Sequence, residues 1–399
     1  MPPTFITIPS KLSTLYKYFL KVLTRMSKNV IEAALDDKAP LSTSFFRPQW
    51  KWRAPSQYQR INTIDTHTGG EPTRIIVSGL PPIHGSNVLE KRRYFMQHYD
   101  NLRRGLLLEP RGHADMYGAI LTSPSNPKEA DLDVFFINTH GYSSMCGHAT
   151  LAITKVVFET GLIEKEGQET REIRLNSPAG IVYARATFHN KTGEVARSFF
   201  RNVPSFVYRQ HLTVAVPGLG DLTFDLSFGG IFYAIVPLGA LPISQQLEMT
   251  PENYNAYISL GRKIRTAVLC DPEIVIQHPI ESDLNELHGV IFTGPPHDPQ
   301  NHSRNVNVFG DGEVDRSPTG TGVSARAALH FARGEIGVGQ VFTVESIVGS
   351  TMTGRVVEEV QFGGFNAVVP EVGGVAHIMS QTELLFDPND PFQNGFLLR

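Results

Sequence analysis

The chain has 399 residues, of which 41% are hydrophobic and 19% are charged, a balance typical of globular proteins of two or three domains. Its 36 Lys and Arg residues against 39 Asp and Glu residues leave a net charge of −3. This near-balance argues against a nucleic-acid partner, which would need a basic excess. Two cysteines exclude a disulfide framework and a cysteine-rich zinc site, and no apolar run is long enough to predict a membrane span.

Residues 1–55 differ from the rest and are interpreted as an N-terminal extension. The first acidic residue is Glu32, and these cations precede it: Lys11, Lys17, Lys21, Arg25 and Lys28. Apolar residues at helical spacing lie among them: Leu12, Leu15, Phe19 and Val22. Basic amphipathic segments without acids are typical of organellar transit peptides, but arginine is scarce here. We therefore expect a dispensable extension on a cytoplasmic protein, with mitochondrial targeting as the alternative.

Two segments 160 residues apart follow the same pattern. Asp65 begins the run Asp-Thr-His-Thr-Gly-Gly, and Asp225 begins Asp-Leu-Ser-Phe-Gly-Gly. Each pair of glycines leads into a β-rich run, at residues 74–77 and 232–236. An internal repeat of this kind indicates two similar halves.

Further along each half, a small residue opens a helical pattern. One pattern runs from Cys146 to near Gly161, and the other runs from Thr319 to near Gly334. The final glycines are typical of helix C-caps. The preceding Ser143-Ser144 and Ser317-Pro318 supply the residue types that begin helices, which places Cys146 at the first helical position.

Between these helices, short alternating runs predict strands, with turn signals every ten residues or so. The pattern predicts an α+β protein built from curled antiparallel sheets. We expect two pseudo-symmetric lobes, each a strand-rich shell around one central helix, with the helix N-termini facing a shared cleft. The predicted N-terminal lobe spans residues 56–205 and is completed by residues 371–399, and the C-terminal lobe spans residues 206–370.

A cysteine at a helix N-terminus has a distinctive chemistry. The unpaired N–H groups and the positive end of the helix dipole suit a carboxylate ligand and lower the pKa of a thiol. Cys146, followed by the permissive Gly147, is therefore either a reactive thiol or a buried, inert cysteine. Cys270 has no glycine beside it and is interpreted as the inert kind. Cys146 and His148 are too close in sequence to share a helix face, so we expect no metal site there.

At these residues the sequence resembles the proline racemase family. The resemblance runs from about Ile61 to about His377, and four motifs carry it: Asp65-Thr66-His67-Thr68-Gly69-Gly70-Glu71-Pro72, Arg111-Gly112-His113-Ala114-Asp115-Met116, Met145-Cys146-Gly147-His148 and Asp315-Arg316-Ser317-Pro318-Thr319-Gly320-Thr321-Gly322. It implies the diaminopimelate epimerase-like fold, two pseudo-symmetric lobes around an active-site cleft, which agrees with the internal repeat. It also implies catalysis without cofactors.

One position departs from the racemase pattern. Proline racemases place a cysteine on each face of the substrate α-carbon, and Cys146 matches the first, but Thr319 stands where the second belongs. A threonine hydroxyl is too weak an acid and base to complete a racemisation alone. Family members with a Cys/Thr pair look like trans-3-hydroxy-L-proline dehydratases, which are hydro-lyases. A proline racemase, a hydroxyproline epimerase and a non-catalytic imino-acid-binding relative remain as alternatives.

The resemblance also implies roles for individual residues. Cys146 would remove the α-proton of trans-3-hydroxy-L-proline, and Thr319 would line the opposite face. The product would be Δ1-pyrroline-2-carboxylate. Asp315 would accept a hydrogen bond from the ring ammonium. The substrate carboxylate would bind between the helix starts, at Gly147, His148, Gly320 and Thr321.

The remaining motif residues are interpreted as architecture. Asp65, His67, Gly69 and Gly70 would shape a turn at the end of a strand near the cleft, and Arg111 and His113 would have a similar supporting role. The expected partner is a small-molecule substrate, hydroxyproline, with no nucleic acid and no membrane, and a homodimer is left open as the assembly.

Overall fold

The computed structural model describes residues 52–164 and 170–398. The chain divides into two units, residues 1–54 and residues 55–399, and the second unit is described below. The basic amphipathic helix expected near residues 11–28 lies outside the described residues. None of the helices in the described part of the chain is long and apolar enough to cross a lipid bilayer.

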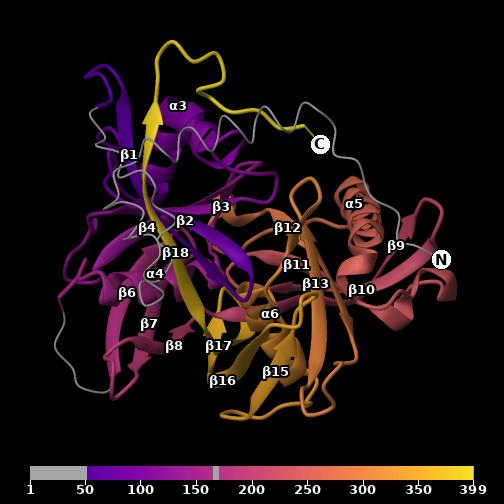
Figure 1. Ribbon diagram of the computed structural model, residues 1–399. Coiled ribbons are helices and arrows are strands. Elements are labelled where there is room, and N and C mark those ends of the chain that lie inside the picture. The colour runs from indigo at the N-terminus through magenta and orange to yellow at the C-terminus, as the bar shows by residue number, and fades with distance from the viewer. Residues whose placement is uncertain (1–51, 165–169, 399) are drawn as a thin grey trace, which may run out of the picture. The chain divides into compact units, whose positions relative to one another are not determined.

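The N-terminal half of the second unit alternates strands with two long helices (Figure 1). In chain order, its elements are β1 (Gln59–Thr68), β2 (Glu71–Ser78), α3 (Val88–Leu107), β3 (Tyr117–Thr122), β4 (Leu132–Asn138), β5 (Tyr142–Ser143), α4 (Gly147–Glu159), β6 (Thr170–Ser177), β7 (Gly180–Phe188) and β8 (Val195–Arg201).

The C-terminal half repeats this order. Its elements are β9 (Ser205–Val216), β10 (Gly220–Phe228), β11 (Phe232–Pro237), α5 (Tyr254–Cys270), β12 (Leu287–Gly294), β13 (Ser303–Phe309), β14 (Glu313–Asp315), α6 (Gly320–Ala332), β15 (Val341–Glu345), β16 (Thr351–Phe362), β17 (Phe365–Gly374) and β18 (Ala376–Phe386). Short 3-10 turns lie at η1 (Leu238–Ala240), η2 (Ile243–Gln245), η3 (Pro251–Asn253) and η4 (Ser282–Leu284).

Strand pairing confirms the internal repeat found in the sequence. The β2–β3 and β4–β6 pairs are parallel, as are the corresponding β11–β12 and β13–β15 pairs. The β3–β4 and β6–β7 pairs are antiparallel, as are β12–β13 and β15–β16. The fold is therefore α+β with two similar lobes, but the expectation of purely antiparallel sheets was wrong.

The parallel pairs explain two helices that the sequence analysis missed. Parallel neighbours cannot be joined by a tight turn and need a long crossover, usually a helix. In this chain α3 connects β2 to β3, and α5 connects β11 to β12. Each lobe thus carries a second helix in addition to its central one.

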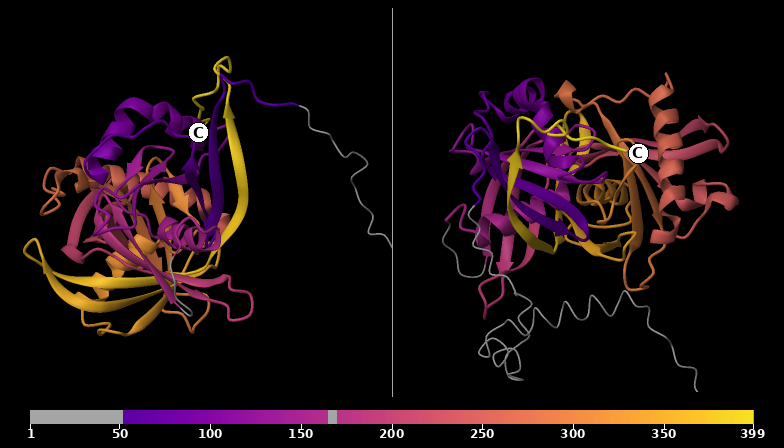
Figure 2. Two further views of the ribbon diagram at one scale, coloured as in Figure 1. Left: turned by 90° about the vertical axis from the view of Figure 1, so that its left-hand side faces the viewer. Right: turned by 45° about the horizontal axis from the view of Figure 1, so that its top comes forward.

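The chain passes from one lobe to the other through two strands, β9 and β18. The C-terminal strand β18 pairs along its length with β1, from Gln59↔Phe386 to Thr68↔Ala376, and Figure 2 shows the two strands side by side. In the same way β9 pairs with β10, and β17 pairs with β8 and β9. The segment 376–386 therefore belongs to the sheet of β1, although the exact lobe boundaries stay predictions.

The central helices α4 and α6 are buried on nearly every side. In α4, eleven of the 13 residues are buried, and the same holds in α6, which is the pattern of a helix inside a core. Helix α4 packs against β1, β2, β7, β8 and β18, and α6 packs against β9, β10, β11, β16 and β17. Gly161 and Gly334 follow the two helices with φ of +69°, which confirms the predicted C-caps.

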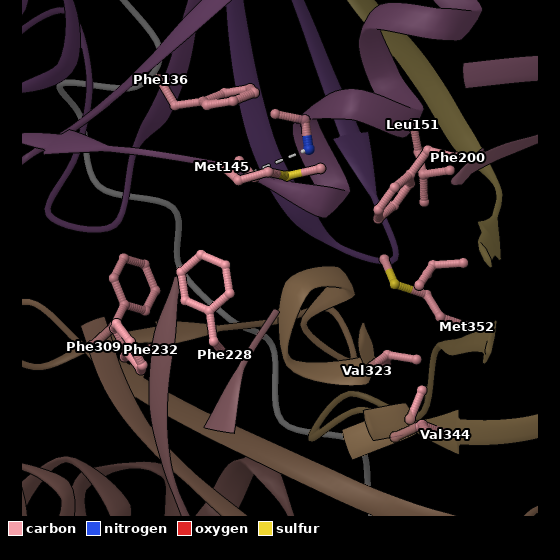
Figure 3. Close-up of a cluster of buried hydrophobic side chains, with 14 of the residues drawn as sticks. Phe136, Met145, Leu151, Phe200, Phe228, Phe232, Phe309, Val323, Val344 and Met352 are labelled. Carbon is pink, nitrogen blue, oxygen red and sulfur yellow. Dashed lines mark hydrogen bonds between the residues drawn. The ribbon is translucent and has the colours of Figure 1, made fainter. Parts of the chain in front are cut away.

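The cores of the two lobes form one continuous apolar cluster. Figure 3 shows Phe136, Met145 and Leu151 of the first lobe facing the Phe228, Phe232 and Val323 side of the second. The cluster extends from one central helix to the other and fixes both in place. It leaves their N-terminal ends to meet between the lobes.

Both repeated acids form ion pairs. Asp65 forms a buried ion pair with Arg74, with 2.8 Å between Oδ2 and Nη2. Its counterpart Asp225 binds Arg333 at 2.7 Å. His67 stacks on His377 at 5.0 Å between ring centroids. The contacts of Asp65 and His67 join strands, and that of Asp225 joins β10 to the C-terminal end of α6. None of the four charged side chains lines the cavity with Cys146.

Arg111 and His113 also support the chain. The Arg111 guanidinium binds the carbonyl oxygens of Leu385 and Gln393, which anchors the segment after β18. His113 accepts a hydrogen bond at Nδ1 from the backbone N–H of Asp115, at 3.2 Å.

Gly229, the first residue of the repeated glycine pair in the second lobe, packs closely against α6. A Cβ on Gly229 would lie 2.2 Å from the Thr321 carbonyl oxygen and 2.6 Å from the Ala325 nitrogen. Both atoms belong to the backbone of α6 and cannot rotate away. Gly229→Ala should lower the free energy of unfolding by about 3 kcal/mol, the upper end of the usual cost of overpacking.

Urea denaturation followed by circular dichroism measures this change. The matched control is Gly337→Ala, because Gly337 is exposed and a Cβ added there would meet nothing within 4 Å. Equal midpoints for the two variants would contradict the close packing of this turn on α6.

Candidate functional site

The N-termini of the two central helices touch each other. A Cβ on Gly147 would lie 2.6 Å from the Gly320 Cα, and a Cβ on Gly320 would lie 2.8 Å from the Gly147 Cα. Only glycine permits backbones to approach so closely. The unpaired N–H groups of both first turns therefore converge on one point, and the expected shared cleft between the helix ends is present.

A small cavity lies at this point. Every site residue proposed from the sequence lines it: Cys146, Gly147, His148, Asp315, Thr319, Gly320 and Thr321. Sequence reasoning missed the remaining lining residues: Tyr117, Met145, Tyr233, His288, Asn307 and Phe309. Most of these lie on strands. Tyr117 directly follows the motif that ends at Met116, and Tyr233 lies in the β-rich run at residues 232–236, so their sequence positions were the signal that could have found them.

Cys146 caps α4 instead of opening it. The helix begins at Gly147, and the Cys146 sulfur accepts a hydrogen bond from the Ala149 N–H at 3.4 Å. Cys146 therefore lies one residue before its predicted position in the helix, and it takes the capping role predicted for the serines before it. A second donor, the Tyr117 hydroxyl, also hydrogen bonds to the sulfur.

The thiol does not have the lowered pKa that a helix N-terminus predicts. Burial raises the pKa of Cys146 well above its ordinary value, and the nearby carboxyl groups of Asp315 and Glu71 raise it further. The hydrogen bonds from Ala149 and Tyr117 act in the opposite direction but are outweighed. The expectation fails because loss of solvent in the closed cavity exceeds the stabilisation that the helix end provides.

His148 lies beside the sulfur as a neutral ring. Its Nδ1 is 3.2 Å from the Cys146 Sγ. Burial lowers the pKa of His148 to about 3, while a hydrogen bond to the Pro72 backbone raises it only in part. An uncharged imidazole can hold a neighbouring polar group without adding a charge to the cavity.

Asp315 ends the short strand β14 and is 4% exposed. It accepts a hydrogen bond from the Ser317 N–H at 2.8 Å. Burial raises the pKa of Asp315 to about 6, although hydrogen bonding from Ser317 and the charge of Arg316 lower it. At neutral pH the group is a carboxylate suited to a cationic ligand.

Thr319 precedes α6 in a strained conformation. Its φ of 67° and ψ of 88° lie in the left-handed region, which β-branched residues rarely enter. The Thr319 N–H donates to the Ser317 hydroxyl at 3.1 Å. Thr319 is thus the N-cap residue, in place of the predicted serine, and it makes no side-chain capping bond. Strain of this kind is common at functional sites.

Contacts between the lobes hold the Asp315 turn. Glu71, at the start of β2, accepts a hydrogen bond from the Arg316 N–H at 2.7 Å. The Arg316 guanidinium forms an ion pair with Asp115 at 2.7 Å, and the Ser350 hydroxyl donates to the Gly69 carbonyl at 2.7 Å. The first sequence motif therefore supports the fourth from across the cavity.

Cys270 has no place in this site. It is the last residue of α5 and is exposed, so the interpretation of a buried cysteine was wrong. It terminates a surface helix whose buried residues lie on the opposite face.

Comparisons with known proteins agree with the family resemblance that the motifs carry. The model of the proline racemase family matches residues 63–397. The trans-3-hydroxy-L-proline dehydratase of Colwellia psychrerythraea is 42% identical over 94% of this chain and its own full length. The proline racemase of Clostridioides difficile is 39% identical over 85% of this chain and 98% of its own.

A solved structure shares the same architecture. The crystal structure of a hydroxyproline epimerase from Agrobacterium vitis, with bound trans-4-hydroxy-L-proline, is 28% identical. It superposes with a TM-score of 0.78 and covers 85% of this chain and 95% of its own. The names of these relatives denote different reactions. The chain described here belongs to the proline racemase family.

Proposed function

We propose that this chain is a hydro-lyase that converts trans-3-hydroxy-L-proline to Δ1-pyrroline-2-carboxylate and water without a cofactor. The observation that carries the proposal is the asymmetry of the cavity. Cys146 lines the cavity at one helix start, and Thr319 lines it at the other. A thiolate is a competent base for an α-proton, whereas an alcohol is not.

The stereochemistry of the substrate suits a single base. In trans-3-hydroxy-L-proline the α-hydrogen and the 3-hydroxyl both lie on the ring face opposite the carboxylate. Elimination therefore needs chemistry on one face only. The Cys146 sulfur removes the α-proton, the C3–O bond breaks, and the proton passes to the leaving oxygen, while Thr319 fills the opposite face.

The two helix ends supply the carboxylate site. The backbone N–H groups of Gly147, His148, Gly320 and Thr321 converge where the helices touch, and helix N-termini favour anions. A carboxylate bound there gains more negative charge as the α-carbanion forms. Donors arranged in advance for such charge are typically worth about 3 kcal/mol each in transition-state stabilisation.

Asp315 binds the ring ammonium in this proposal. The ammonium also solves the problem of the raised thiol pKa. The carboxyl groups of Asp315 and Glu71 raise the pKa of the thiol and so oppose thiolate formation. A bound cation beside Asp315 offsets them, so substrate binding lowers the pKa of the Cys146 thiol.

The relatives favour a second candidate, a proline racemase or hydroxyproline epimerase. Proteins with those names match this chain nearly as well as the dehydratase does. Racemisation requires a proton donor on the second face, and Thr319 is the group available there. A panel of proline and hydroxyproline isomers, with chemical trapping of the imine, separates the two: imine from trans-3-hydroxy-L-proline supports dehydration, and loss of optical rotation from L-proline contradicts it.

Replacing the sulfur tests the proposed base. Cys146→Ser should reduce imine formation by about 10³-fold, because a serine hydroxyl is a far weaker base, while binding of pyrrole-2-carboxylate, a planar analogue, persists. Cys270→Ser is the control, because Cys270 lies outside the cavity, and it should retain wild-type turnover. Full turnover by Cys146→Ser would refute the assignment.

Restoring a second thiol tests the two-faced geometry. In Thr319→Cys, a sulfur stands on the face opposite Cys146, and the variant should gain exchange of the L-proline α-proton with deuterated solvent. Proton NMR of the recovered proline measures the exchange. Absence of exchange in a folded variant would show that residue 319 does not face the α-carbon.

The pKa of Asp315, raised to about 6 by burial, predicts an acidic limit on activity. Below that pH the carboxyl group is protonated and no longer attracts the ring ammonium, so kcat/KM should fall about tenfold per pH unit, as one titrating group requires. Asp315→Asn should show low activity without this acidic limb. The same limb in the variant would assign it to another group.

A further inference from the structure

A line of hydrogen bonds leads from Asn138, at the end of β4, to the sulfur of Cys146. The Asn138 side-chain amide donates to the Ser143 hydroxyl at 3.1 Å. Ser143 donates to the Tyr117 phenol, and the Tyr117 hydroxyl donates to the Cys146 sulfur. The Asn138 amide is oriented by its oxygen, which accepts from the backbone N–H groups of His140 and Gly141 at 2.9 and 2.7 Å.

Tyr117 is held rigidly at the end of this line. It begins β3, is 3% exposed and lines the cavity. Its ring meets the His148 ring edge-on, with 4.8 Å between centroids, and its backbone pairs with Asn138 of β4. The phenol therefore points at the sulfur with little freedom to turn away.

We propose that Tyr117 is a catalytic residue that delivers the proton to the departing 3-hydroxyl group. This inference rests on the proposed dehydration and assigns the path of its proton. The sulfur approaches the α-hydrogen, and the leaving oxygen lies on the neighbouring carbon on the same ring face. A hydroxyl that already donates to the sulfur thus lies next to the leaving oxygen.

The proton balance closes within one turnover. The Cys146 thiolate takes the α-proton and becomes a thiol, and the electron pair of the C–H bond forms the C2=C3 double bond as the C3–O bond breaks. Tyr117 gives its proton to the leaving oxygen, which departs as water, and recovers a proton from the Cys146 thiol. The thiolate and phenol are regenerated, and the enamine tautomerises to Δ1-pyrroline-2-carboxylate.

The second tyrosine in the cavity provides a contrast. The Tyr233 hydroxyl bonds to the Thr321 hydroxyl at 2.7 Å, at the start of α6. It is engaged at the helix end opposite Cys146, where the carboxylate is proposed to bind. Tyr233→Phe is therefore the matched control for Tyr117→Phe, since each change removes one phenolic oxygen from the same cavity.

Two substrates that differ in their leaving group separate proton delivery from a structural role. The 3-hydroxyl group of trans-3-hydroxy-L-proline must be protonated to leave as water, whereas fluoride leaves from trans-3-fluoro-L-proline as an anion. Both eliminations begin with the same α-proton transfer and give the same imine. Imine formation by the wild-type protein from the hydroxylated substrate measures the proposed function by itself, so its failure is distinct from a failure of Tyr117.

Tyr117→Phe should lower kcat/KM for trans-3-hydroxy-L-proline by about 100-fold, as loss of a general acid does, and lower it for the fluoro analogue by less than about threefold. Tyr233→Phe should affect both substrates by the same factor. If Tyr117 only orients or tunes the sulfur, Tyr117→Phe will slow both eliminations equally. Equal losses, or no loss with either substrate, would overturn the inference.

If Tyr117→Phe does not bind pyrrole-2-carboxylate, the variant is misfolded and cannot be used. Ser143→Ala is then the variant to test. Ser143→Ala removes the hydrogen bond to the phenol without altering the cavity wall, because Ser143 does not line it. Without that donor the phenol is a weaker acid. The hydroxylated substrate should lose activity selectively, and an equal effect on the fluoro analogue would again overturn the proposal.

Discussion

The close contact between Gly147 and Gly320 is the constraint on which the site depends. With any side chain at either position, the first turns of α4 and α6 would be forced apart. Because they touch, two sets of unpaired N–H groups meet in one small, solvent-poor cavity. Both helices are kept in this position by the apolar cluster that the two lobes share. The pairing of β18 with β1 and of β9 with β10 supports the same arrangement.

Symmetry in the scaffold contrasts with asymmetry in the chemistry. Strands β5 and β14 are equivalent, since each is a short antiparallel partner of the strand before it. The first ends at Ser143 and the second at Asp315. The N-terminal lobe therefore directs hydrogen-bond donors toward the sulfur of Cys146. The C-terminal lobe places the carboxylate of Asp315 near Thr319. Under the proposed function, this division assigns proton transfer to one lobe and charge recognition to the other.

The sequence identified what is encoded locally. The residues around Cys146 and Thr319 lie in contiguous motifs at helix starts, so their convergence followed from the repeat and from the chemistry of helix ends. Tyr117 and Tyr233 lie on strands far from those motifs, and only the tertiary fold brings them to the cavity. The helices α3 and α5 were missed because no parallel strand pairs were anticipated.

The thiol pKa shows why local reasoning has a limit. The helix-terminus argument gave the correct sign for the Ala149 hydrogen bond, but burial and two carboxyl groups from distant segments decide the outcome. Such terms depend on what the whole fold packs around a group. The exposure of Cys270 is a similar case, since it reflects which face of α5 meets the core.

A crystal structure with pyrrole-2-carboxylate bound would show whether the two helix starts hold the substrate. The ring should lie between Cys146 on one face and Thr319 on the other, with the carboxylate on the N–H groups of both helices and the ring nitrogen toward Asp315. A ligand bound outside this cavity, or one whose α-carbon lies out of reach of the Cys146 sulfur, would contradict this arrangement.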